Sequence, residues 1–178
     1  MFAFLAPNRR GEAWFSVGLV SSFPDITESE SDALSDTRPC RQERTQGCKV
    51  FKVPREDATL AGQVAASDIE DVAFTAQELR DQVLVFQYKG KIHAINNECP
   101  HSSYPLSEGA PFDIEDFGVV LSAGITCIKH GWSFDLFSGQ GDRGYKLKLW
   151  ETELRAVPGR AVDDEEREVW VRRKQKIG

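Results

Sequence analysis

Two short cysteine–histidine motifs constrain this chain more than any other feature of its sequence. Cys99 and His101 form a C-x-H motif, and Cys127 and His130 form a C-x-x-H motif. The chain has only 3 histidines in 178 residues, and two of them follow a cysteine this closely. A fold that uses all four residues at one site must bring two separate loops together.

Two cysteines and two histidines match the ligand set of a Rieske-type 2Fe-2S cluster, in which histidines replace cysteines on one of the two irons. A cysteine ligand brings a negative thiolate, whereas histidine binds as a neutral imidazole. The oxidised cluster is therefore formally neutral, while an all-cysteine cluster carries two negative charges and accepts an electron less readily. The pattern predicts one 2Fe-2S cluster, held by Cys99, His101, Cys127 and His130, and a function in electron transfer.

Two alternatives use the same residues differently. Structural zinc sites also combine two cysteines and two histidines, but their usual spacing pairs like residues, as C-x2-4-C followed by H-x3-5-H. Here unlike residues are paired, and this happens twice. The spacing favours the cluster, and a non-redox interaction module with zinc at the same residues is the alternative function. In the second alternative the four residues bind no metal and are ordinary buried thiols and surface histidines.

The surrounding residues resemble soluble Rieske-type 2Fe-2S ferredoxins and small eukaryotic Rieske-domain proteins. The second loop reads H-G-W-S-F-D from His130, the first loop runs over residues 99–106, and D-I-E-D stands at 113–116 between them. The resemblance covers about residues 48–173. It implies an all-β fold, an antiparallel β sandwich of three sheets with a small cluster-binding subdomain, and it carries over the same four ligands.

Other loop residues are expected to support the cluster rather than to bind it. Pro100 would stiffen the first loop, and Gly131 would meet a backbone requirement beside the cluster. Trp132 and Phe134 would pack the second loop.

Departures from the respiratory and photosynthetic members of this family are also informative. Those proteins have one further cysteine in each loop, joined in a disulfide, where this chain has Tyr104 and Lys129. Their serine and tyrosine hydroxyls, which donate to cluster and ligand sulfur, would fall at Trp132 and Phe134, and neither residue has an O–H group. Fewer donors leave the reduced cluster less stabilised. We therefore expect a midpoint potential in the low half of the Rieske range.

Three segments are expected along the chain. Residues 1–47 are predicted to be a disordered tail, because the stretch is polar and mixes serine with acidic residues. Residues 48–173 form the Rieske domain, and 174–178 form a basic end. Within the domain, residues 83–88 and 91–96 predict a hairpin that leads to Cys99. Residues 118–121 and 125–127 predict a second strand pair, with a turn around Ser122, Ala123 and Gly124, that leads to the second loop.

Charge and hydropathy limit the partners. A net charge of −6 argues against a nucleic-acid surface and suits a basic redox partner. No stretch approaches the ~20 apolar residues of a membrane span, and no glycine-rich nucleotide fingerprint is present. We expect electrons to come from a separate NAD(P)H-dependent reductase and to pass to an oxygenase or another acceptor.

The remaining cysteines and histidine bear on compartment and catalysis. Cys40 and Cys48 are expected to be free thiols in the cytoplasm, with mitochondria as the alternative location. A Rieske oxygenase also needs a mononuclear iron held by two further histidines and a carboxylate. Only His93 is left for that, and 48 residues follow His130. The sequence therefore predicts an electron-transfer component rather than an enzyme.

Overall fold

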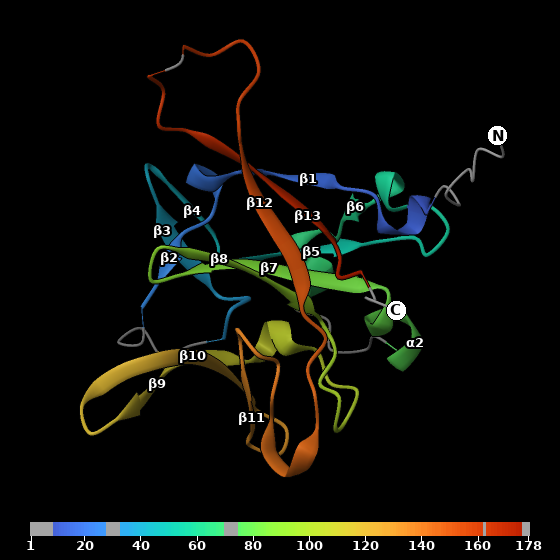
Figure 1. Ribbon diagram of the computed structural model, residues 1–178, viewed down its shortest axis with the longest axis vertical. Coiled ribbons are helices and arrows are strands. Elements are labelled where there is room, and N and C mark those ends of the chain that lie inside the picture. The colour runs from blue at the N-terminus through green and yellow to red at the C-terminus, as the bar shows by residue number, and fades with distance from the viewer. Residues whose placement is uncertain (1–8, 28–32, 70–74, 162, 176–178) are drawn as a thin grey trace, which may run out of the picture.

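The computed structural model describes residues 9–27, 33–69, 75–161 and 163–175, and its sheets lie one above another in Figure 1. The middle sheet contains β2 (Asp25–Ile26), β5 (Cys48–Lys52), β6 (Gly62–Gln63), β7 (Gln82–Tyr88) and β8 (Lys91–Asn96). One outer sheet has the order β1 (Phe15–Leu19), β13 (Arg167–Arg173), β12 (Trp150–Ala156), and the other β11 (Trp132–Asp135), β10 (Val119–Cys127), β9 (Ala110–Asp116). The expected all-β fold with three sheets is confirmed.

Smaller elements connect these sheets. A two-stranded ribbon is formed by β3 (Thr37–Cys40) and β4 (Glu43–Gln46), and the described residues include the short α-helices α1 (Ala66–Ile69) and α2 (Ala76–Arg80). Single 3-10 turns are η1 (Arg10–Glu12), η2 (Val20–Ser22), η4 (Ala58–Leu60), η5 (Leu106–Glu108) and η6 (Asp142–Gly144).

Strand β7 holds the layers together because both of its faces are buried. Val83 and Val85 belong to a core cluster with residues of β1, β12 and β13. Leu84 and Phe86 belong to a second cluster with residues of β10 and β11. Successive side chains of a strand point to opposite faces, so one strand serves both cores. The second core contains Cys99 and Cys127, which ties the two loops to the centre of the protein.

The expectation of a disordered tail over residues 1–47 is wrong for residues 9–27 and 33–47. Strand β1 pairs antiparallel with β13, and Phe15 and Val17 are 6% and 3% exposed. The partner strand lies about 150 residues away along the chain, so local composition does not reveal the pairing. Residues 1–8 and 28–32, including the acidic serine-rich run, lie outside the described residues.

The hairpin predicted before the first loop is confirmed. Strands β7 and β8 pair antiparallel from Val83 with Asn96 to Tyr88 with Lys91. The turn residues Lys89 and Gly90 have φ of 46° and 78°. Positive φ at both turn residues matches the right-handed twist of the flanking strands.

The strand pair predicted around Ser122–Gly124 is wrong. Residues 119–127 form the single strand β10, and its hairpin with β9 turns at Phe117 and Gly118, where φ is 47° and 76°. Gly124 was read as a turn residue, but it provides room for the ring of Phe112 on β9. A Cβ atom at position 124 would lie 2.5 Å from Cζ of that ring.

His93, the histidine outside the two motifs, lies on β8 and is 6% exposed. Its ring stacks on Phe86 at a centroid distance of 5.5 Å and meets the edge of Phe137 at 5.2 Å. Burial and, to a smaller extent, the nearby charge of Lys91 lower the pKa of His93 to about 4. The neutral imidazole therefore behaves as part of the apolar packing.

We expect His93 to make the fold sensitive to acid. The unfolded imidazole takes up a proton near pH 6.5 and the folded one only near pH 4, so stability is lost as pH falls through this window. Between pH 7 and pH 4 the loss from this residue is roughly 3 kcal/mol. In urea unfolding, His93→Phe should show a pH dependence smaller by that amount. Equal pH slopes for the two proteins would contradict the burial of a neutral ring.

Candidate metal centre

Each motif lies in a tight loop that leaves a strand. In the first loop, the backbone N–H of Cys99 donates to the carbonyl of Tyr104 at 2.8 Å, and that of Ser103 donates to the carbonyl of Cys99 at 2.9 Å. The second loop joins β10 to β11, where Cys127 is paired with Trp132. The N–H of Gly131 donates back to the carbonyl of Cys127 at 2.9 Å. Backbone hydrogen bonds thus shape both loops.

The fold brings all four predicted ligands together and pairs them by type. Cys99 and Cys127, 0% and 1% exposed, form a hydrogen bond through their side chains. The rings of His101 and His130 lie 4.9 Å apart between centroids, His101 half-buried and His130 exposed. A Rieske cluster has two sulfur ligands on one iron and two imidazoles on the other. The arrangement of like with like matches that requirement.

The two thiols share one negative charge readily and resist a second. The hydrogen bond from the Cys127 thiol lowers the pKa of Cys99, and the hydroxyl of Ser102 acts in the same direction. The same bond raises the pKa of Cys127, and burial raises it further. Two adjacent buried thiolates need a positive charge beside them. Iron supplies such a charge.

A second observation also fits a metal at this place. The Nδ1 atom of His101 is buried and has no hydrogen-bond partner within the described residues. Buried polar atoms are rarely left without a partner, and a bound metal ion is one explanation for such an atom. Across the described parts of the chain, no three His, Cys, Asp or Glu side chains converge to hold a single ion. A Rieske cluster does not require such a group, because each iron takes two protein ligands.

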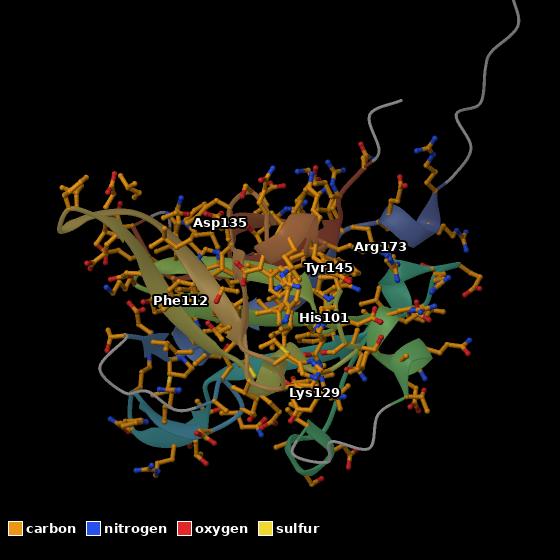
Figure 2. All side chains as sticks on the ribbon, turned by 90° about the horizontal axis from the view of Figure 1, so that it is seen from below. His101, Phe112, Lys129, Asp135, Tyr145 and Arg173 are labelled. Atoms are coloured by element: carbon orange, nitrogen blue, oxygen red, sulfur yellow. The ribbon has the colours of Figure 1, made fainter. Side chains whose placement is uncertain are left out.

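Two aromatic rings contact His101, and Figure 2 shows one of them, Tyr145, close to it. Trp132 stacks on His101 with ring centroids 4.2 Å apart and planes 13° apart. Tyr145, which follows η6, meets the edge of His101 at 5.4 Å and that of Trp132 at 5.0 Å. The second motif predicts a packing role for Trp132, whereas no spacing rule connects the segment of Tyr145 to either motif.

The two positions that replace the family's disulfide are neighbours in space. The Nζ atom of Lys129 lies 5.7 Å from the centroid of the Tyr104 ring. A cation–π contact of this kind contributes on the order of 0.5–1 kcal/mol at an exposed site. The two loops are therefore linked here by a noncovalent contact.

A hydroxyl near sulfur, which the sequence analysis expected to be missing, is supplied by Ser102. Its Oγ lies 4.0 Å from Sγ of Cys127. The adjacent Ser103 turns away and donates to the carboxylate of Glu98 at 2.9 Å. The serine next to His101 could have been noticed from its position, but sequence does not show which of two consecutive serines faces the sulfur.

The other residues expected to support the loops have different environments. Phe134 is 1% exposed, and Gly141 lies against its ring, where a Cβ atom would be 2.3 Å from Cδ1. Pro100 is half-buried in the turn between Cys99 and His101. Their support of a bound cluster stays a prediction.

Comparison with known proteins identifies related sequences. The model of the Rieske [2Fe-2S] domain matches residues 58–148. The ferredoxin component of the alkene monooxygenase system of Xanthobacter autotrophicus is 31% identical over 81 residues, which are 46% of this chain and 60% of that protein. The ferredoxin subunit of the methanesulfonate monooxygenase of Methylosulfonomonas methylovora is 33% identical over 90 residues, which are 47% of this chain and 67% of that protein.

A solved structure shares the fold. The protein described as the small subunit of an NADH-dependent nitrite reductase from Mycobacterium tuberculosis aligns with a TM-score of 0.50 at 14% identity. The alignment covers 93% of this chain and 98% of that one. At this identity the likeness concerns the fold alone. Separately, no helix in the described parts of the chain has the length and apolar character needed to cross a bilayer.

Gly131 offers a test of the second loop's geometry. Its φ is 72°, in the left-handed region, and a Cβ atom there would meet nothing within 4 Å. Gly131→Ala should therefore lower the free energy of unfolding by about 1–2 kcal/mol through backbone strain alone. Gly62→Ala is the matched control, because its Cβ would also meet nothing within 4 Å and its φ is not left-handed. Equal urea midpoints for the two variants would contradict the strain at position 131.

Proposed function

Because the chain belongs to the Rieske [2Fe-2S] domain family, whose members bind a 2Fe-2S cluster, we propose that it is an electron carrier. It would pass single electrons from an NAD(P)H-dependent reductase to an oxygenase or another redox partner. The observation that carries the proposal is the pairing of two buried thiols beside two neighbouring imidazoles. When bound, the cluster supplies one-electron chemistry.

In this proposal each of the four residues has a distinct task. Cys99 and Cys127 would hold one iron inside the core, where both side chains are shielded from water. His101 and His130 would hold the other iron, and His130 is exposed at the surface. A partner would therefore approach the histidine side. Trp132 and Tyr145 orient the His101 ring by stacking and edge contacts.

The relatives support an oxygenase as the acceptor. Two of them are the ferredoxin component or subunit of a monooxygenase. The chain spans 60% of the length of the alkene monooxygenase ferredoxin. The partners of that protein are therefore not assigned to this chain, and the partners named here are inferred. A reducing compartment such as the cytoplasm is part of the proposal, because Cys40 and Cys48, which are not ligands in it, are free thiols and cytosolic conditions keep thiols reduced.

Metal analysis with single substitutions tests the function and the ligands together. The purified protein should contain two irons and two acid-labile sulfides per chain, and the reduced protein should give an electron paramagnetic resonance signal. His101→Ala and His130→Ala should lose the cluster, because each removes one of the two imidazole ligands of one iron. His93→Phe should retain it and serves as the matched histidine control, since His93 contacts Phe86 and Phe137 instead.

Two results would contradict the proposal. A colourless protein with one zinc and no sulfide would favour a structural site at the same residues. Retention of iron and sulfide in both His101→Ala and His130→Ala would show that the ligands lie elsewhere.

Ser102 provides a test of how the protein sets the potential. We expect a midpoint potential below about +75 mV, the middle of the Rieske range of roughly −150 to +300 mV. The Ser102 hydroxyl, 4.0 Å from Cys127 Sγ, stabilises the more negative reduced state. Ser102→Ala should lower the midpoint by roughly 20–60 mV, the equivalent of about 0.5–1.5 kcal/mol for one hydrogen bond.

Ser103→Ala is the matched control, because its hydroxyl donates to Glu98 and not to sulfur. Its midpoint in a redox titration should stay within about 10 mV of the parent value. An equal shift in both variants would assign the effect to the loop as a whole.

A further inference from the structure

A basic groove of about 1040 Å³ opens next to the segment that carries Tyr145. Eight of its lining residues are Arg or Lys and three are Asp or Glu. The cations include Arg55, Arg80, Lys146, Lys148, Arg173 and Lys174. This excess of positive charge contrasts with the whole chain, which has 22 basic and 28 acidic residues.

The basic groove is continuous with the surface around the histidines. Tyr145 contacts His101, and Lys146 and Lys148 follow it directly along one wall of the groove. The carbonyl of Lys148 accepts a hydrogen bond from the N–H of Asn96 at 2.9 Å, which fixes this wall to the strand that leads to Cys99. In the view of Figure 2, Lys129, His101, Tyr145 and Arg173 follow one another in projection.

Three lysines of the groove are available to a partner. Arg55 pairs with Asp81 at 2.6 Å, Arg80 pairs with Glu98 at 3.5 Å, and Arg173 donates to the carbonyl of Val53 at 2.7 Å. In contrast, Lys146, Lys148 and Lys174 are exposed, and within the described residues none of them forms an ion pair. These side chains therefore project positive charge without an internal counter-ion.

Acidic residues are exposed on another part of the protein, the β9–β10 hairpin. Glu115 and Asp116 are exposed near its tip, and the hairpin extends away from the rest of the structure in Figure 1. The exposed acidic residues of this hairpin are therefore not part of the basic groove. Over distances of a Debye length, about 8 Å at physiological salt, a partner responds to the local charge more than to the net charge.

We propose that the electron-transfer partner docks an acidic protein surface onto the basic groove and across His101 and His130. This proposal rests on the proposed electron-carrier function and names the chemistry of the partner. It differs from the expectation that the net charge suggests, which is a basic partner. Complementary charge at such a face steers encounter and sets orientation more than it adds affinity.

Small oxidants of opposite charge measure the sign of the field at the histidines. The reduced holoprotein is mixed with hexacyanoferrate(III) in a stopped-flow instrument. One electron passes to each oxidant, which becomes hexacyanoferrate(II). We expect the second-order rate constant to fall as salt rises, despite the net charge of −6, because the local attraction is screened. The cationic oxidant tris(phenanthroline)cobalt(III) should show the opposite dependence.

Charge reversal in the groove gives the matched comparison. The double variant Lys146→Glu/Lys148→Glu should slow oxidation by hexacyanoferrate about tenfold at low salt. Arg44→Glu/Arg160→Glu makes the same change in net charge at exposed residues that do not line the groove, and its rate should stay within about twofold. Midpoint potentials of all variants are measured, so that a change in driving force is not mistaken for a change in encounter.

Polyglutamate tests recognition of an acidic polypeptide without using the cluster. In calorimetry it should bind the parent protein at low salt and bind the groove double variant at least tenfold more weakly, whereas free glutamate at the same carboxylate concentration should not bind.

A hexacyanoferrate rate that rises with salt, or equal slowing in both double variants, would overturn the proposal. A protein without a cluster would show no absorbance change with either oxidant. That result would contradict the electron-carrier function, while polyglutamate binding would still report on the groove.

Discussion

The rest of the structure depends on the burial of β7 on both of its faces. Its alternate side chains enter two different cores, so one strand joins the sheet of β1, β12 and β13 to the sheet of β9, β10 and β11. The hairpin with β8 then carries the chain from this strand to Cys99. Since Cys99 and Cys127 belong to the same core as Leu84 and Phe86, the packing that stabilises the domain also sets the distance between the two loops.

This packing places the cysteine side of the site in the core and the histidine side at the surface. The sulfur side of the site is buried and shielded from water, whereas the histidine side reaches the surface among the rings of Trp132 and Tyr145. The basic groove begins on the same surface. A buried cysteine half and an exposed histidine half follow from the orientation of two loops on one core.

Several parts of the fold could be predicted because their signals are local. The β7–β8 hairpin depends on period-two alternation and a two-residue turn, both contained in a short stretch of sequence. The pairing of β1 with β13 joins opposite ends of the chain and has no local signal. Gly124 was misread for a related reason. A glycine within a strand can mark a turn or a close approach by another residue, and the ring of Phe112, which decides between them, comes from a different strand.

The sequence by itself determined the chemistry of the donor atoms. Two thiols and two imidazoles at the C-x-H and C-x-x-H spacing limit the metal centre to few types, since donor identity sets the charge of a cluster. Only the tertiary structure decided that cysteine meets cysteine and histidine meets histidine, although each cysteine is paired with a histidine along the chain. It also decided that Ser102 faces the sulfur, that Tyr145 reaches His101, and that basic residues gather beside the site. The physical reason is that strand pairing and core packing join residues far apart in sequence, so these neighbours exist only once the sheets have assembled.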